Sequence, residues 1–119
     1  MSLNSVPYEK TLRILQQVEL FEHVPTNVIE ELCKKMLISS FRAEDRIINQ
    51  GDEGNSMYVI LSGKVHIHDG DFVVASLHEG SFFGEFSLLD DEPRSLSVSA
   101  ATPCVTGTIL QNDFYRIIN

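Results

Sequence analysis

The chain has 119 residues, of which 43% are hydrophobic and 22% charged, a composition typical of one globular domain with a modest core. Its formal net charge is -8, with 9 basic and 17 acidic residues, which excludes the stripe of Lys and Arg that a DNA-binding surface needs. No apolar run reaches the length that spans a bilayer, and residues 1–10 lack the charged start and apolar block of a signal peptide.

The first third of the chain is predicted to be helical. Apolar residues that recur at three- and four-residue intervals indicate one face of a first helix: they are Tyr8, Leu12, Leu15 and Val18. A second helix is expected after Pro25, with Thr26 as its N-cap. The apolar stripe of this second helix consists of Val28, Ile29, Leu32, Cys33 and Met36.

The two cysteines, Cys33 and Cys104, show no CxxC spacing. Cys33 falls on the apolar face of the second predicted helix. We therefore expect both to be buried, reduced core thiols, as is usual in a cytosolic chain.

After Ser39 the pattern changes to short strands separated by turn signals. The predicted strands are Ile47–Ile48, Met57–Leu61, Lys64–His68, Phe72–Leu77, Ser97–Ala101 and Val105–Leu110. Residues 50–55 (Gln-Gly-Asp-Glu-Gly-Asn) are a strong turn signal, and the turn Asp69-Gly70-Asp71 predicts a hairpin. A short helical turn is expected over Glu85–Leu89, and a last helix from Phe114, capped by Asn112 or Asp113. Many short strands framed by helices favour a small antiparallel barrel or jelly roll.

One cation stands out in this acidic chain, because Arg94 is the only Lys or Arg between Lys64 and Arg116. Gly84 permits close backbone approach or a positive φ. If a helical turn follows Gly84, its first N–H groups can bind phosphate. Glu85 would then suit a neutral hydroxyl such as a ribose 2′-OH. The alternative is a surface ion pair of Arg94 with Asp91 or Glu92, which contributes little.

Two segments of the chain form recognisable motifs. Residues 83–89 (Phe-Gly-Glu-Phe-Ser-Leu-Leu) followed by residues 93–98 (Pro-Arg-Ser-Leu-Ser-Val) resemble the phosphate-binding cassette of the cyclic nucleotide-binding domain family. Residues 47–65 independently resemble its early barrel strands, and Leu20-Phe21 with the helix after Pro25 fits its N-terminal helices. The resemblance implies a mainly β fold: an eight-stranded antiparallel β-roll, or jelly roll, with N-terminal helices, a short cassette helix and a truncated C-terminal helix.

The resemblance also implies roles for individual residues. Glu85 would hold the ribose 2′-OH and Arg94 the cyclic phosphate of the ligand. The remaining ligand contacts would come from the backbone N–H groups of Gly84, Phe86, Ser87 and Ser95 and from Val65 and Leu77 as apolar neighbours of the base. Leu96 departs from the family pattern, which has a small residue there, and Ser95 does not distinguish cAMP from cGMP.

The resemblance divides the chain into three parts of one domain: N-terminal helices over residues 1–40, the β-roll over 41–111 and the start of a C-terminal helix over 112–119. It implies a cytoplasmic regulatory domain that binds cAMP or cGMP and signals occupancy to an output domain or partner subunit outside this chain. A second copy of the chain is a further candidate partner, whereas nucleic acid and membrane are not. We expect the chain to be a fragment of a longer regulator or a stand-alone barrel without its lid helix.

Two other functions compete with this interpretation. A β-roll that has lost nucleotide binding would serve as a protein-interaction module, since fold does not fix function. His66 and His68 on one strand face suggest a metal in a cupin-like enzyme, but two histidines are too few ligands for a catalytic site. Because no nucleophile elbow, P-loop or CxxC is present, we expect no catalysis.

Overall fold

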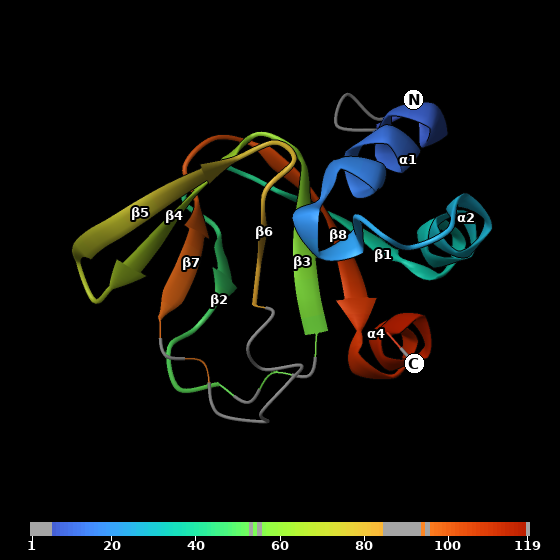
Figure 1. The fold of residues 1–119 in the computed structure, drawn as a ribbon. Helices are drawn as coiled ribbons and strands as arrows, with labels where there is room; N and C mark the ends of the chain where they lie inside the picture. Colours follow the sequence, from blue (N-terminus) through green and yellow to red (C-terminus); the bar gives the residue numbers. More distant parts are fainter. Residues whose placement is uncertain (1–5, 53, 55, 85–93, 95, 119) are drawn as a thin grey trace.

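Among the described residues, helices precede and follow a block of strands, the order expected for a β-roll framed by helices (Figure 1). The computed structural model describes residues 6–52, 54, 56–84, 94 and 96–118. The helices are α1 (Tyr8–Gln17), the 3-10 turn η1 (Glu19–Phe21), α2 (Thr26–Lys35) and α4 (Gln111–Ile118). The strands are β1 (Leu37–Phe41), β2 (Arg46–Ile48), β3 (Ser56–Ser62), β4 (Lys64–Asp69), β5 (Phe72–His78), β6 (Phe82–Phe83), β7 (Ser97–Ala100) and β8 (Cys104–Leu110).

The eight strands form two antiparallel four-stranded sheets, which confirms the predicted β-roll. The first sheet has the order β1-β8-β3-β6 and the second the order β2-β7-β4-β5. The described helices lie on the side of the first sheet (Figure 1). The predicted hairpin is β4-β5, in which Asp69 pairs with Phe72 across the Gly70 turn. None of the described helices is both long enough and apolar enough to cross a membrane.

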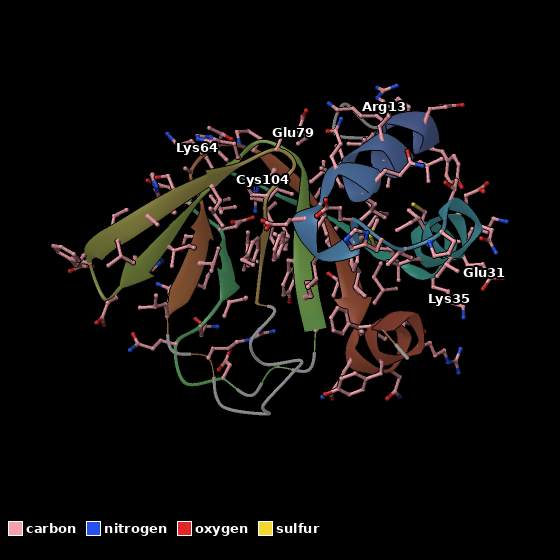
Figure 2. All side chains as sticks on the ribbon, viewed as in Figure 1. Arg13, Glu31, Lys35, Lys64, Glu79 and Cys104 are labelled. Carbon is pink, nitrogen blue, oxygen red and sulfur yellow. The ribbon has the colours of Figure 1, made fainter. Side chains whose placement is uncertain are left out.

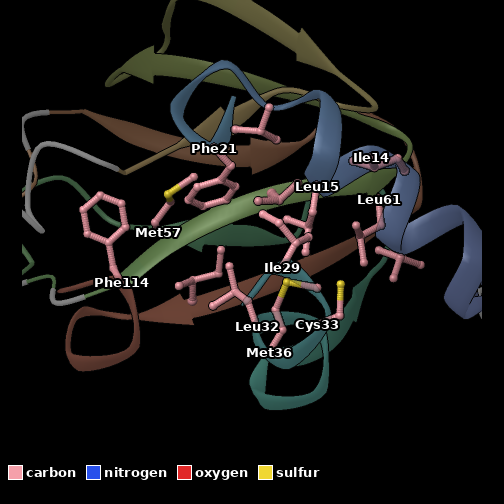
Figure 3. Packing of buried hydrophobic residues seen from close by; sticks show 14 residues of the cluster. Ile14, Leu15, Phe21, Ile29, Leu32, Cys33, Met36, Met57, Leu61 and Phe114 are labelled. Atoms are coloured by element: carbon pink, nitrogen blue, oxygen red, sulfur yellow. The ribbon is translucent and has the colours of Figure 1, made fainter. Parts of the chain in front are cut away.

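The larger hydrophobic cluster joins the helices to the first sheet (Figure 3). Leu15 of α1, Phe21 of η1 and Ile29 of α2 are each no more than 1% exposed. They share this cluster with Met57 of β3 and Phe114 of α4. Burial of these large side chains supplies the main driving force for docking the helices, because short isolated helices are marginal in water.

A second cluster fills the interior between the two sheets. Its buried members are Ile48, Ile60, Val65, Phe83, Val98, Ala100 and Cys104. Alternation along β3 explains the division between the clusters. Met57, Val59 and Leu61 face the helices, whereas Ile60 and the half-buried Tyr58 face the second cluster.

Two local expectations about the helices were wrong. Tyr8 of α1 is 43% exposed, and the buried residues of that helix are Thr11, Ile14 and Leu15. Thr11 tolerates burial because its hydroxyl donates to the Pro7 carbonyl at 3.2 Å. The predicted Thr26 cap is the first helical residue, and Pro25 occupies the N-cap without a side-chain hydrogen bond.

The ends of the chain's β region also differ from expectation. α4 begins at Gln111, directly after β8, so Asn112 and Asp113 lie inside the helix and do not cap it at Phe114.

Strands β1 and β6 were not predicted. Their hydrogen-bonding partners, β8 and β3, are distant in sequence, and a two-residue strand such as β6 has no periodicity to detect.

Both cysteines are buried and unpaired, as predicted. Burial, and secondly the nearby Glu30 carboxylate, raises the pKa of the Cys33 thiol to about 11 from an ordinary 9.0. Since the thiolate is the reactive form, we expect iodoacetamide at pH 8 to modify Cys33 at least about 100-fold more slowly in the folded protein than in urea. Mass spectrometry of the peptide that carries Cys33 measures both rates.

The same pKa shift has a consequence for stability. As pH rises, the unfolded chain releases the Cys33 proton first, at about its ordinary pKa. The contribution of this thiol to the free energy of unfolding is therefore complete below pH 9.0 and is lost as pH rises towards 11. Equal rates of iodoacetamide alkylation in the folded and urea-unfolded chains would contradict the claim that burial raises the pKa of Cys33.

Candidate anion-binding site

The backbone of Arg94 is anchored to the turn that precedes β3. Its N–H donates to the Asp52 carbonyl at 2.8 Å, and its carbonyl accepts from the Gly51 N–H at 2.7 Å. These reciprocal bonds hold residue 94 beside the 50–52 turn, although the two segments are far apart in sequence. The turn was predicted; its pairing with Arg94 was not.

The half-buried side chain of Arg94 extends the same connection to two more segments. Nη1 donates to the carbonyl of Gly84 at 3.0 Å, just beyond β6. Nη2 donates to the carbonyl of Ser56 at 2.9 Å and to its Oγ at 3.4 Å, at the start of β3. A planar guanidinium bonded to two carbonyls in this way has a fixed orientation. The structure thus brings together Gly84 and Arg94, as the sequence predicted.

Gly84 meets two requirements that another residue would not. Its φ of 85° lies in the left-handed region, where a side chain is strained. A Cβ there would lie 2.7 Å from Nη1 of Arg94 and 3.2 Å from the Ser56 carbonyl oxygen. Both of the properties anticipated for this glycine, a positive φ and close backbone approach, are therefore present.

Two residues of this site, Gly54 and Ser56, were not predicted from the sequence. A methyl group at Gly54 would overlap Nε and Cζ of Arg94, so the glycine makes room for the guanidinium. Ser56 supplies a carbonyl and a hydroxyl to Nη2. Gly54 was interpreted only as part of a turn, and backbone carbonyls carry no signal in the sequence.

The apolar residues predicted to lie near the site line the interior of the roll. Val65 and Leu77 are directly paired across β4 and β5. Val65 is fully buried in the second cluster, and Leu77 packs against that cluster. Phe83, which precedes Gly84, belongs to the same cluster and stacks on Tyr58 with ring centroids 5.1 Å apart. The Arg94 site therefore adjoins an apolar interior.

The remaining predicted contacts lie outside the described residues. These are Glu85, Phe86, Ser87 and Ser95, together with the helical turn expected over 85–89. The alternative partners of Arg94, Asp91 and Glu92, also lie outside them. Leu96, the departure from the family pattern, is half-buried.

The two histidines considered as metal ligands have other hydrogen-bonding partners. Nδ1 of His68 donates to the Gly70 carbonyl at 2.7 Å, and its Nε2 lies 2.8 Å from Ser99 Oγ. Nδ1 of His66 lies 3.0 Å from Ser76 Oγ. Within the described part of the chain, no three His, Cys, Asp or Glu side chains are grouped to hold a metal ion. These contacts give protein partners to both ring nitrogens of His68 and to Nδ1 of His66.

The arrangement around Arg94 is suited to binding an anion. A guanidinium is permanently charged, and its planar fork matches the oxygens of a phosphate or carboxylate. Partial burial strengthens such a contact, because the local dielectric is lower than in water. The described residues of this site therefore form a fixed cationic centre beside an apolar wall.

The overlap at Gly54 generates a prediction for a double-mutant cycle. No positive φ constrains Gly54, so the main cost of Gly54→Ala is its overlap with Arg94. We expect Gly54→Ala to lower the free energy of unfolding by about 1–3 kcal/mol in urea titrations. In an Arg94→Ala background the overlap is gone, and the same change should be neutral or stabilising by up to about 1 kcal/mol.

Gly70 provides the control for the cycle. It has a positive φ, and no atom lies within 4 Å of the place that an added Cβ would occupy, so Gly70→Ala should cost the same in both backgrounds. Additive effects of Gly54→Ala and Arg94→Ala would contradict the close approach of these two residues.

Nearly the whole chain is similar to part of a kinase regulatory subunit. The chain is 35% identical over 115 residues to the cAMP-dependent protein kinase regulatory subunit of Candida albicans. The matched region covers 96% of the chain but only 25% of that protein. The chain thus spans about a quarter of the length of this relative.

Solved structures share the fold. The regulatory domain of protein kinase A from Toxoplasma gondii, solved with cAMP, is 28% identical, with a TM-score of 0.86 over 92% of this chain and 44% of that one. The regulatory subunit of a cAMP-independent protein kinase A from Trypanosoma brucei is 24% identical, with a TM-score of 0.82 over 93% of this chain and 43% of that one.

The family assignment rests on a match across most of the chain. Residues 38–119, which include every strand but the first residue of β1, match the profile of the family described as "Cyclic nucleotide-binding domain". The match contains Gly54, Gly84 and Arg94. The chain therefore belongs to the cyclic nucleotide-binding domain family.

Proposed function

We propose that this domain binds a cyclic nucleotide, cAMP or cGMP, and that Arg94 neutralises the cyclic phosphate. The observation that carries the proposal is the Arg94 guanidinium, held by the carbonyls of Gly84 and Ser56 within a chain of this family. A permanent cation fixed beside an apolar interior suits a ligand that joins a phosphate to a base.

The other roles in this proposal follow from the family resemblance. Glu85 accepts a hydrogen bond from the ribose 2′-OH, which explains a carboxylate close to a phosphate. The backbone N–H groups of Gly84, Phe86, Ser87 and Ser95 complete the phosphate cradle. Val65 and Leu77, which adjoin each other across β4 and β5, are apolar neighbours of the base.

The contacts of Arg94 suggest how occupancy is transmitted. The guanidinium and the backbone of Arg94 link the 50–52 turn, the start of β3 and the end of β6. A phosphate that binds Arg94 changes the balance of these contacts and favours the conformation with the higher affinity for ligand. The response is a population shift driven by that difference in affinity.

The recipient of the signal is an output domain or partner subunit. The relative from Candida albicans supports this part of the proposal, because the chain matches only a quarter of its length. We place the domain in the cytoplasm, since two buried, unpaired thiols suit a reducing compartment.

A second candidate function is a protein-interaction module that does not respond to cAMP. The regulatory subunit from Trypanosoma brucei, described as part of a cAMP-independent kinase, has the same fold. The half-buried Leu96, which departs from the family pattern, also favours this alternative. Nucleotide titration separates the two functions.

We expect isothermal titration calorimetry to show saturable binding of cAMP or cGMP by the native chain. Arg94→Ala should weaken that binding by roughly 10- to 150-fold, which corresponds to about 1.5–3 kcal/mol for hydrogen bonds to a charged group. Arg94→Lys keeps the positive charge but loses the planar fork, so its affinity for the nucleotide should fall between those of the native chain and of Arg94→Ala. 5′-AMP, which lacks the cyclic ester, should bind more weakly than cAMP.

Arg13→Ala is the matched control, because Arg13 is an exposed arginine of α1 on the helical side of the molecule (Figure 2). Thermal unfolding of each variant verifies that it folds. The absence of heat from either nucleotide at millimolar concentration would reject the nucleotide proposal in favour of the interaction module. Equal affinities of the native chain and the folded Arg94→Lys and Arg94→Ala variants would reject the role of Arg94.

A further inference from the structure

The outer face of the second sheet carries an unusual set of side chains. Successive residues of a strand point to opposite faces, so the residues that alternate with the buried Val65 and Val98 point outward. The outward residues of β2, β7, β4 and β5 are Arg46, Ser97, Ser99, Lys64, His66, His68, Val73, Ser76 and His78. Ser97 and His68 are buried, and Val73, which pairs with His68, is an exposed apolar residue. We call this set the β4 face. It contains two permanent cations and three of the four histidines of the chain.

Hydrogen bonds confirm that Arg46, Ser99 and His68 share one face, and that His66 and Ser76 do. Arg46 Nε donates to Ser99 Oγ at 3.1 Å, and Ser99 Oγ lies 2.8 Å from His68 Nε2. His66 Nδ1 lies 3.0 Å from Ser76 Oγ on β5. The contacts run across all four strands and hold the polar side chains in place.

Carboxylates are excluded from this face in an otherwise acidic chain. The structure describes all residues of the four strands, and their one carboxylate is Asp69, which alternates away from His66 and His68. The acids that flank the strands in sequence include Asp45, which accepts from the Arg42 N–H, and Glu79, which pairs with Lys10 at 2.9 Å. Asp71 lies in the hairpin turn. The β4 face is therefore locally basic although the net charge is -8.

Several nitrogens of this face are available to a ligand. Lys64 pairs directly with His78 across β4 and β5, and His66 follows Lys64 on the same face. Among the described residues, Nζ of Lys64, Nε2 of His66 and the ring of His78 have no hydrogen-bond or ion-pair partner. The helices lie against the other sheet, so no described helix covers this face (Figure 1).

We propose that the β4 face docks an extended acidic segment of a protein partner. Outward residues of β4 repeat about every 7 Å, and the side chains on one face of an extended peptide repeat at the same spacing. Carboxylates at alternate residues of such a segment therefore lie opposite Lys64 and His66 in succession. A long polyanion such as nucleic acid is disfavoured, because it would meet the remaining acidic surface of the chain.

The test uses the 119-residue chain and a fluorescein-labelled peptide of alternating Glu and Ser, eight residues long, at low salt. We expect saturable binding by fluorescence anisotropy. Lys64→Glu should weaken it about three- to tenfold, the effect of reversing one partner of an exposed ion pair. Arg13→Glu makes the same change in net charge on α1 and should leave the affinity within twofold (Figure 2).

A second pair of variants tests the imidazoles without changing permanent charge. The double change His66→Gln and His78→Gln should weaken binding, whereas His23→Gln, on the exposed loop before α2, should not. Backbone amide NMR shifts on titration should concentrate in β4 and β5. Arg94→Ala should bind the peptide with unchanged affinity, so this test is independent of nucleotide binding.

Four outcomes would overturn the proposal. These are no saturable binding, equal weakening by Arg13→Glu and Lys64→Glu, amide shifts centred on the helices, and tighter binding of a single-stranded oligonucleotide than of the acidic peptide. Thermal unfolding establishes that each variant is folded before its affinity is compared.

Discussion

The bonding of one guanidinium organises one end of this fold. Arg94 is half-buried, and a charged group removed from water must find polar partners in the protein. The carbonyls of Gly84 and Ser56 meet that requirement, and the backbone of Arg94 completes the connection to the 50–52 turn. Side chains must be absent where the guanidinium passes closest to the backbone, which accounts for glycine at 54 and 84.

The two hydrophobic clusters have different structural roles. The larger cluster uses the first sheet to hold the helices, and its burial of aromatic and aliphatic side chains anchors α1, α2 and α4. The second cluster fills the roll and supports the apolar wall beside Arg94. Because the described helices cover only the first sheet, the second sheet keeps an exposed outer face, with polar side chains on β4 and exposed apolar side chains on β5. The fold thus presents a candidate ligand site and a separate basic surface.

Local patterns predicted most strands because they depend on neighbouring residues. Alternation in Lys64–His68 and the Asp69-Gly70-Asp71 turn were enough to predict the β4-β5 hairpin. Helix termini were harder. Thr26 has the chemistry of a cap, yet α2 already includes it, and α4 starts three residues before Phe114 because it continues directly from β8. Where an element begins depends on its packing as well as on its residues.

The sequence by itself predicted the β-roll class and the burial of both cysteines, because these follow from local patterns of residue types. A shared site for Gly84 and Arg94 was implied by the family resemblance. Only the tertiary structure decided which groups surround Arg94. Gly54 and Ser56 reach it through turns and strand pairings that join distant segments, and a backbone carbonyl is present at every residue whatever the sequence. The basic outer face likewise depends on strand register, which places Arg46, Lys64 and His66 on one side of the sheet, since β2, β7 and the β4-β5 hairpin come from separate parts of the chain.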